Sequence, residues 1–412
     1  MLNMKLKKYK LGEILDVTRG ASLSGEFYAT EGEYIRLTCG NFDYQNNCFK
    51  ENKSKDNLYY VGDFKPEFLM EEGDIITPLT EQAIGLLGST AIIPESSKYI
   101  QSQDVAKIIC KEDLLDKDFA FYLISSALVK QQLSAAAQQT KIRHTSPDKI
   151  KDCTVWIPEL SEQKRIGKLL CSIDRKIELN RTINQNLEAM AKQLYDYWFV
   201  QFDFPNEEGK PYKSSGGEMV WNEKLKRMIP KEWTNANIYQ LASISKETVN
   251  PLARPNELFK HYSLPEYDKT GTYAEEYGID IQSAKFTVTN NCILVSKLNP
   301  WTSRVICGNR ESNQICSTAF VVWNPASMKT KGFLFMLAKS AKFIEYCTQG
   351  ATGTSHSHRR INPELMMKFD FSYNSEIAIK FSRLIENIIG KLHDNIAQLK
   401  VLTKQRDELL PL

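Results

Sequence analysis

Two short segments gather the side chains best suited to bind nucleic acid. They hold three of the five histidines, together with amides, hydroxyls and basic groups. Such side chains hydrogen-bond base edges and phosphates, so both segments are candidate DNA-binding loops, although a solvated polar loop has the same composition. The predicted contacts are Gln138, Gln139, Thr140, Lys141, Arg143 and His144 in the first half, and Thr354, Ser355, His356, Ser357, His358, Arg359 and Arg360 in the second.

Two further arginines are weaker candidates for DNA contacts, because isolated basic residues are common on surfaces. Arg19 lies near the start of the chain, and Arg304 follows a predicted strand at Ile293–Ser296. The pair His356 and His358 could also bind a metal ion, but no third ligand is evident nearby. We therefore predict no metal site.

Catalytic motifs are incomplete. Asn299-Pro300-Trp301 distantly resembles the motif with which amino-methyltransferases hold their target base, but it lacks the second proline, and no glycine-rich loop for S-adenosylmethionine occurs. No P-loop is present either. Pro147-Asp148 with Glu162-Gln163-Lys164 formally fits a nuclease pattern. Its second carboxylate, however, falls in the first turn of a predicted helix, where a negative charge simply suits the helix dipole.

A long helix is predicted over residues 158–200, with Ser161 as its N-cap. Apolar residues recur at alternating steps of four and three, which is the seam of a coiled coil. About 38 residues correspond to a rod of roughly 55 Å, too long for the core of one compact domain. The seam residues are Ile166, Leu170, Ile173, Ile177, Asn180, Asn184, Leu187 and Leu194.

A second long helix is predicted over residues 376–412, where Ile389, Leu392, Ile396 and Leu399 continue the same spacing. The two seam asparagines of the first helix, Asn180 and Asn184, allow two interpretations. They are either locally exposed, or buried so that they fix the register of an antiparallel helix pair at some cost in stability.

The two halves of the chain repeat one plan. Leu11, Ile14, Leu15 and Val17 match Ile238, Leu241, Ala242 and Ile244, and Pro147-Asp148 matches Pro363-Glu364. Each half ends with a strand and a long helix. We therefore expect a mixed α/β fold: two globular domains related by a pseudo-two-fold repeat, separated by two long antiparallel coiled-coil helices.

The predicted organisation has five parts, with a first domain at 1–158, a helix at 159–200, a linker at 201–231, a second domain at 232–375 and a helix at 376–412. Within the first domain, residues 41–65 are expected to form a long exposed loop, and residues 118–133 a single helix.

Composition limits the class of protein. The 412 residues are 42% hydrophobic and 25% charged, which is typical of globular domains. The net charge of +3 means that any nucleic-acid site must be a local basic patch. Nine scattered cysteines without a C-x-x-C pair indicate reduced thiols in a cytoplasmic protein. No signal peptide or membrane span is predicted.

The chain resembles the specificity subunits of type I restriction–modification systems along essentially its whole length. The resemblance rests on the stretch from Ile157-Pro158-Glu159-Leu160-Ser161-Glu162-Gln163 to Tyr197-Trp198-Phe199, and on Phe202-Asp203-Phe204-Pro205 and Ile229-Pro230-Lys231-Glu232-Trp233. One departure is Tyr373-Asn374-Ser375-Glu376-Ile377, which replaces the usual P-L-x-E-Q entry to the second helix.

The resemblance implies a non-catalytic subunit in which each globular domain reads one half of a split DNA sequence. It implies partners that carry the chemistry: two modification subunits that methylate adenine N6 with S-adenosylmethionine, and restriction subunits that supply ATP- and Mg²⁺-dependent motor and nuclease activity. No cofactor is then expected in this chain. The alternatives are a self-contained nuclease or methyltransferase with an unrecognised site, and a coiled-coil adaptor that binds only protein.

Overall fold

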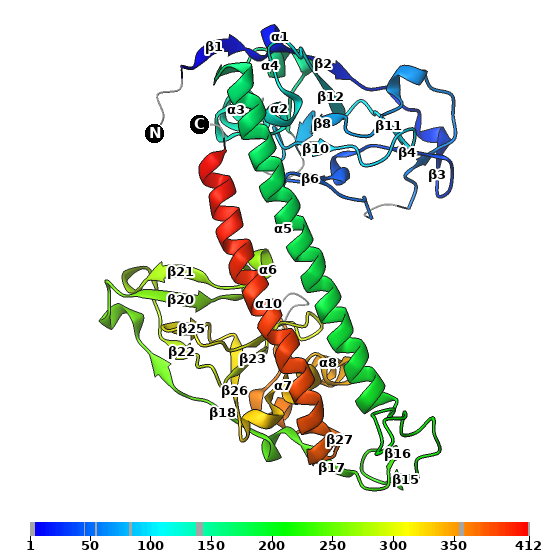
Figure 1. The fold of residues 1–412 in the computed structure, drawn as a ribbon, viewed down its shortest axis with the longest axis vertical. Helices are drawn as coiled ribbons and strands as arrows, with labels where there is room; N and C mark the ends of the chain where they lie inside the picture. The colour runs from blue at the N-terminus through cyan, green and yellow to red at the C-terminus, as the bar shows by residue number, and fades with distance from the viewer. Residues whose placement is uncertain are drawn as a thin grey trace. The chain divides into compact units, whose positions relative to one another are not determined.

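The computed structural model describes residues 5–44, 46–53, 56–81, 85–136, 143–353 and 358–410. The chain divides into two compact units (Figure 1). Unit 1 comprises Met1–Glu178 with Val401–Leu412, and unit 2 comprises Leu179–Lys400. The two long helices therefore contribute residues to both units, and each unit is described separately below.

A four-stranded antiparallel sheet forms the centre of unit 1, in the order β10-β8-β12-β2. Side chains alternate along β8, so that Ile75 belongs to one apolar cluster and Ile76 to another. Both faces of the sheet are thus buried. The strands of this sheet are β2 (Leu15–Arg19), β8 (Ile75–Pro78), β10 (Ala91–Ile92) and β12 (Val105–Cys110).

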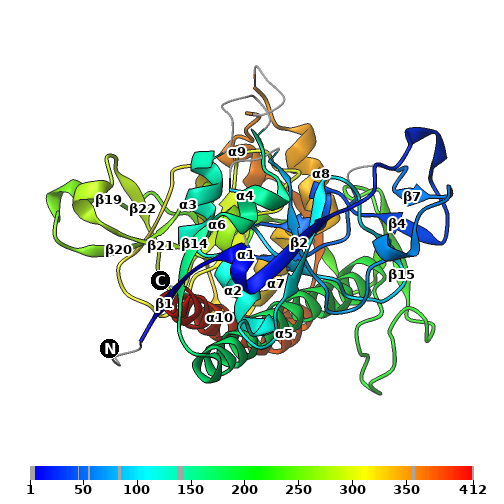
Figure 2. The same cartoon turned by 90° about the horizontal axis from the view of Figure 1, so that it is seen from above.

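Short elements complete unit 1. The strands are β1 (Lys7–Lys10), β3 (Tyr28–Ala29), β4 (Tyr34–Arg36), β5 (Phe42–Asp43), β6 (Cys48–Phe49), β7 (Tyr59–Tyr60), β9 (Thr80–Glu81), β11 (Tyr99–Ile100), β13 (Arg143–His144) and β14 (Thr154–Ile157). The helices are α1 (Leu11–Ile14), α2 (Lys117–Ile124), α3 (Ala127–Ala136), α4 (Pro147–Lys151) and the start of α5 (Leu160–Tyr195). Figure 2 shows α1, α2 and α4 grouped near β2 and β14.

Two expectations for unit 1 were wrong. Residues 41–65 are not one exposed loop, because they form β5, β6 and β7 and bury Phe42, Leu58 and Tyr60. Residues 118–133 form two helices rather than one. The Ser125 hydroxyl donates to the carbonyls of Phe121 and Tyr122 and closes α2, and such local side-chain bonds compete with helix continuation.

Unit 2 repeats the central sheet of unit 1, in the order β24-β23-β26-β18. Each strand has its counterpart in the same place: β18 for β2, β23 for β8, β24 for β10 and β26 for β12. The repeat read from the sequence is therefore confirmed at the level of the sheet. The strands are β18 (Ala242–Ile244), β23 (Ile293–Ser296), β24 (Val305–Cys307) and β26 (Phe320–Pro325).

The remaining strands of unit 2 form a five-stranded sheet, a strand pair that joins the two ends of the domain, and a hairpin in the predicted linker. They are β15 (Met219–Asn222), β16 (Arg227–Pro230), β17 (Thr234–Asn237), β19 (Thr248–Val249), β20 (Leu258–Tyr262), β21 (Ala274–Tyr277), β22 (Lys285–Thr287), β25 (Gln314–Cys316) and β27 (Asp370–Tyr373). The helices are α6 (Leu264–Thr270), α7 (Lys331–Ala338), α8 (Ala341–Gln349), α9 (Pro363–Met367) and α10 (Ser375–Leu409).

Helix α5 is fastened to unit 1 near its first turn. The predicted N-cap, Ser161, lies inside the helix, because the helix begins at Leu160. The buried amide of Gln163 donates to the carbonyls of Leu114 and Pro158 and accepts from the backbone of Asp116. Gly167 then allows α5 to approach the start of α2 closely, since a Cβ there would lie 2.7 Å from the Phe119 nitrogen.

Helix α10 meets unit 2 in an equivalent way, although the small residues are exchanged. Here the glycine is Gly332 on α7, and the long helix contributes Ser382, which is fully buried. The Ser382 hydroxyl accepts from the Phe333 backbone at 2.9 Å. In unit 1 the matching backbone group, that of Phe119, is capped by Asp116 instead.

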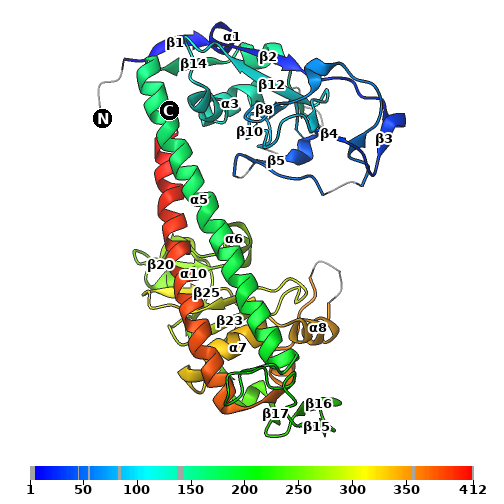
Figure 3. The same cartoon turned by 45° about the vertical axis from the view of Figure 1, so that its right-hand side comes forward.

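Within unit 2, the second part of α5 packs antiparallel to α10 (Figure 3). Asn180 donates to Gln398 at 2.8 Å, and Asn395 donates to Asn184 at 3.0 Å, so rising numbers on one helix meet falling numbers on the other. Asn180 is buried. Of the two interpretations of the seam asparagines, the structure therefore favours cross-helix hydrogen bonds that specify register.

Candidate nucleic-acid interface

The two basic loops occupy equivalent places in the two units. In unit 1, β13 pairs with β9, so that Arg143 lies opposite Glu81 and His144 opposite Thr80. In unit 2, Arg360 bridges to Leu298. Both loops are thus held against the segment that follows the middle strand β8 or β23, and both lead into a short helix, α4 or α9. This register aligns Arg143 with Arg359 and His144 with Arg360.

Arg143 is held from two sides. Its guanidinium donates to the Ser134 hydroxyl at 2.9 Å and lies 3.6 Å from the Glu81 carboxylate. Glu81 is buried, and its other carboxylate oxygen accepts from the Gly85 backbone at 2.8 Å. The Arg143 side chain remains about one third exposed, so part of its guanidinium stays available to a ligand.

His144 belongs to a short polar chain. Its Nδ1 lies 3.3 Å from the Thr80 hydroxyl, which donates to Asp104. The residue itself is exposed. The ring is therefore oriented by β9 while its other edge faces outward.

In unit 2 the position opposite Arg359 holds an uncharged amide. The Arg359 backbone N–H donates to the side-chain oxygen of Asn299, and the Asn299 backbone N–H donates to the Arg359 carbonyl. The guanidinium of Arg359 donates to the Ala351 carbonyl at 2.6 Å. Its charge is not neutralised by any ion pair within the described part of the chain.

Lys297 joins this basic group, although no motif in the sequence indicated it. It precedes the bridge between Leu298 and Arg360 and is only partly exposed. Burial and the positive charge of Arg360 lower the pKa of Lys297. Neither Lys297 nor Arg360 forms a side-chain ion pair with any residue that the structure describes. In the sequence, only the position of Lys297 directly after strand β23 could have indicated it.

The two isolated arginines have partners within the protein. Arg304 makes a bidentate ion pair with Asp268 of α6, at 2.6 and 2.8 Å, and its side chain is 13% exposed. The guanidinium of Arg304 is therefore already occupied by its ion pair with Asp268. Arg19 is exposed at the end of β2, and its Nε donates to the Gln103 carbonyl, which leaves its terminal nitrogens accessible.

Several predicted contacts lie outside the described residues, and the structure gives no account of them. They are Gln138, Gln139, Thr140, Lys141, Thr354, Ser355, His356 and Ser357. His358, the remaining loop residue, is exposed.

The predicted seam residues lie mainly on the inner faces of the long helices. Leu170, Ile173 and Ile177 are buried, as are Ile389 and Leu392. Partial burial is found for Ile166, Asn184, Leu187, Leu194, Ile396 and Leu399. In unit 1, Asp174 of α5 accepts from Tyr122 of α2 at 2.7 Å and lies 3.5 Å from Arg406 of α10.

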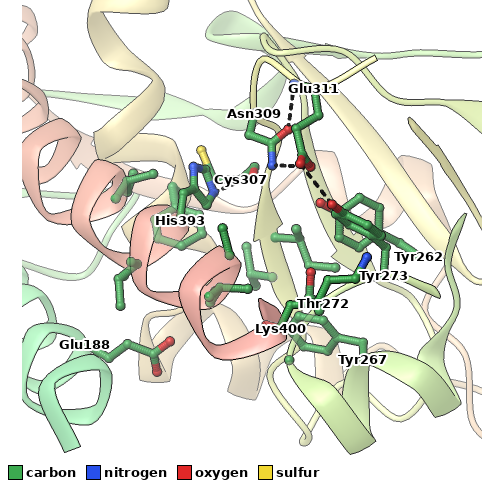
Figure 4. Close-up of a pocket in the computed structure, with 18 of the residues that line it drawn as sticks. Glu188, Tyr262, Tyr267, Thr272, Tyr273, Cys307, Asn309, Glu311, His393 and Lys400 are labelled. Carbon is green, nitrogen blue, oxygen red and sulfur yellow. Dashed lines mark hydrogen bonds between the residues drawn. The ribbon is translucent and has the colours of Figure 1, made fainter. Parts of the chain in front are cut away.

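A pocket of about 100 Å³ lies in unit 2 where α10 meets the edge of the domain (Figure 4). Its polar groups already have partners. His393 lies 3.2 Å from the Cys307 carbonyl, and the Glu311 carboxylate accepts from Tyr273 and Asn309. Lys400 pairs with Glu275 at 2.7 Å. We interpret these polar contacts as interactions that hold α10 against the rest of unit 2.

Among the described residues, no group of three or more His, Cys, Asp or Glu side chains is placed to hold a metal ion. In the same ranges, no helix is long and apolar enough to span a membrane.

The fold defines a class of protein: a two-unit α/β protein with two long helices and a basic loop at the same place in each unit. Comparison with known proteins shows which proteins it is similar to. Residues 3–189 match the type I restriction modification DNA specificity domain. The chain is 20% identical over 345 residues to the type I restriction enzyme MjaIX specificity subunit of Methanocaldococcus jannaschii, covering 75% of this chain and 71% of that protein.

A second relative is the HindI specificity subunit of Haemophilus influenzae, which is 22% identical over 372 residues, 77% of this chain and 79% of that protein. The fold is similar to the type I restriction–modification S subunit from M. genitalium, with a TM-score of 0.64 at 14% identity, covering 100% of this chain and 96% of that one. Residues 3–189 thus match the type I restriction modification DNA specificity domain, and over most of its length the chain is similar to type I specificity subunits.

Proposed function

We propose that this chain recognises an asymmetric, bipartite DNA target, with one half-site read by each unit. The observation that carries the proposal is the repeated placement of a basic loop beside the segment that follows the middle strand. Arg143 in unit 1 and Arg359 in unit 2 occupy matching positions on matching scaffolds.

The asymmetry of the target follows from differences at those matching positions. Opposite Arg143 the chain has the carboxylate of Glu81, whereas opposite Arg359 it has the amide of Asn299. Side chains of different charge and donor pattern select different base edges. Two different half-sites are therefore expected on one shared scaffold.

The long helices would set the unread spacer between the half-sites. The 36 residues of α5 correspond to roughly 54 Å at 1.5 Å per residue. B-DNA rises about 3.4 Å per base pair, so a helix of this length spans at most ~16 base pairs. The spacer should be shorter, because the ends of both helices pack against their own units.

Modification subunits would dock on the outer faces of the helices. Leu179, Ile183 and Met190 are exposed on α5, although its inner face is already buried. Exposed apolar side chains that follow one another along a helix mark protein interaction surfaces. The proposed partners are two adenine-N6 methyltransferase subunits with S-adenosylmethionine, joined by motor and nuclease subunits that use ATP and Mg²⁺.

In this scheme the chain binds and positions DNA, and the partners perform the chemistry. Methylation of adenine inside a duplex requires the base to be flipped into the methyltransferase site. The specificity subunit then needs only to grip the flanking base pairs and backbone.

The test compares the purified chain alone with the chain co-purified with its modification subunit. Each sample is incubated with host DNA and S-adenosylmethionine, and the methylated positions are sequenced. We expect adenine methylation at a split motif only in the complex. Methylation or cleavage by the chain alone would support the alternative of a self-contained enzyme.

A further inference from the structure

We propose that the outer face of the β1–β14 strand pair in unit 1 binds a segment of the modification subunit that carries apolar and acidic side chains. The inference rests on the proposed function, which makes that subunit a partner of this chain. It adds a docking surface to those on the outer faces of the long helices.

The outer face of this strand pair exposes two large apolar side chains beside a cation. Lys8 lies opposite Trp156, and side chains alternate along a strand, so both point away from the side on which Val155 is buried. Trp156 is 44% exposed, and Leu6, two residues before Lys8, is 47% exposed. The Lys8 ammonium lies 5.7 Å from the centre of the Trp156 ring. A partner that covered this face would therefore bury apolar surface next to a positive charge.

The internal repeat supplies a counterpart of this face whose occupant is visible. The strand pair β17–β27 of unit 2 has the same antiparallel register as β1–β14. Trp233 directly precedes β17, as Leu6 directly precedes β1, and it is only 4% exposed. Ser372 is the counterpart of Trp156, and it is 7% exposed. The outer face that is open in unit 1 is thus closed in unit 2.

The polypeptide that follows α5 closes the face in unit 2. The ring of Trp233 packs against three aromatic rings of that segment, with centroids 5.2 to 5.6 Å apart. The three rings are those of Phe199, Phe202 and Phe204. The β15–β16 hairpin then places the Lys224 ammonium 2.7 Å from Asp370, which shares its face of β27 with Ser372. Figures 1 and 3 show this hairpin beside β17. This scaffold therefore accepts a polypeptide that brings apolar side chains and a charge opposite to that of the face.

The charge of the face in unit 1 is the reverse of that in unit 2. Residues 5–10 include four lysines, and within the described part of the chain only Lys10 has an ion pair, with Asp152. Lys5, Lys7 and Lys8 leave a positive field around the exposed indole. Carboxylates on the occupant would complement this field, as the lysine of the hairpin complements Asp370.

A polypeptide fits this face better than DNA does. A phosphate backbone would neutralise the lysines, but it would leave Leu6 and Trp156 without an apolar partner. A protein segment with both kinds of side chain satisfies the whole face. The modification subunit is the protein partner in reach, because only Pro158 and Glu159 separate β14 from α5, along which that subunit is proposed to dock.

The first experiment identifies the occupant in the complex of the full chain with its modification subunit. The photoreactive amino acid p-benzoylphenylalanine is incorporated in place of Trp156, the complex is irradiated with and without DNA, and mass spectrometry identifies the linked peptide. We expect a link to a modification-subunit peptide that contains acidic and apolar residues. A link to DNA, to a second copy of the chain or to the chain's own terminal residues would overturn the proposal, as would the absence of any link.

The second experiment measures the affinity of variant chains for the modification subunit. Trp156→Ser copies the counterpart in unit 2 and should weaken assembly about tenfold or more, whereas Trp156→Phe should keep most of the affinity. Lys8→Glu should weaken assembly and flatten its dependence on salt. Tyr277→Ser is the control, because Tyr277 is an equally exposed aromatic residue on a strand of unit 2, and it should leave the affinity unchanged.

A purely structural role of Trp156 gives a different result. If its ring only supports the strand pair, Trp156→Ser lowers the melting temperature of unit 1 and leaves the affinity for the modification subunit unchanged, which would refute the docking surface. Should such a complex still methylate a split motif, the proposed function stands without this inference. If the unsubstituted chain forms no complex with the modification subunit, the proposed function itself fails, and this inference with it.

Discussion

The contact between α5 and unit 1 at Gly167 gives a prediction whose sign the structure fixes. In an exposed helix interior, changing glycine to alanine stabilises by about 1 kcal/mol. At Gly167 the new Cβ would lie 2.7 Å from the Phe119 nitrogen, 2.9 Å from Asp118 Cβ and 3.0 Å from Asp116 Oδ1. The nitrogen belongs to the backbone of α2 and cannot rotate away.

The steric cost should therefore exceed the gain in helix propensity. Overpacking typically costs about 1–3 kcal/mol, and a rigid backbone neighbour favours the upper end. We expect Gly167→Ala to reduce the free energy of unfolding of unit 1 by about 2 kcal/mol. For a unit of this size the melting temperature should fall by roughly 4–8 °C.

Gly390 provides a matched control, because it lies inside the other long helix with no atom near its would-be Cβ. Gly390→Ala should stabilise unit 2 by about 1 kcal/mol. Calorimetry reports the transitions, and hydrogen exchange of the α2 peptides assigns the loss to unit 1. If Gly167→Ala proves as stabilising as Gly390→Ala, the close approach of α5 to α2 is refuted.

Three further predictions concern the long helices. Ser382→Ala should destabilise unit 2 by about 1–3 kcal/mol, because the buried Phe333 N–H loses its acceptor; an unchanged denaturation midpoint would contradict this. Burial lowers the pKa of His393, so unit 2 should lose stability as the pH falls below about 6.5, and His393→Gln should reduce that loss in urea titrations at pH 5 and 7. Inserting seven residues between Asn180 and Leu187 should lengthen the unread spacer or abolish assembly; methylome sequencing that shows full activity with an unchanged spacer would exclude the ruler model.

The sequence predicted the features that depend on local periodicity. The seam of α5 was readable because residues such as Ile173 and Ile177 face the same side of one helix, whatever surrounds them. The repeat was readable because strands β8 and β23 are buried on both faces, which limits both to apolar residues.

Features that depend on distant partners were not readable. Arg304 makes a bidentate ion pair with Asp268, 36 residues earlier, and nothing in the sequence indicated this partner. Lys297 joins the basic loop only because its neighbour Leu298 bridges to Arg360, 62 positions further along the chain. Phe42 and Tyr60 are buried by neighbours in other short strands. Strands as short as β5 and β7 show no regular spacing of apolar residues that could predict this burial.

The central claim, that each unit reads one half of a split target, is tested most directly by exchanging residues 232–374 for the matching domain of another specificity subunit. Methylome sequencing of a host that expresses the hybrid with its modification subunit gives the motif. We predict that one half-site changes while the other half-site and the spacer are kept. Changes in both half-sites, or in neither, would contradict it.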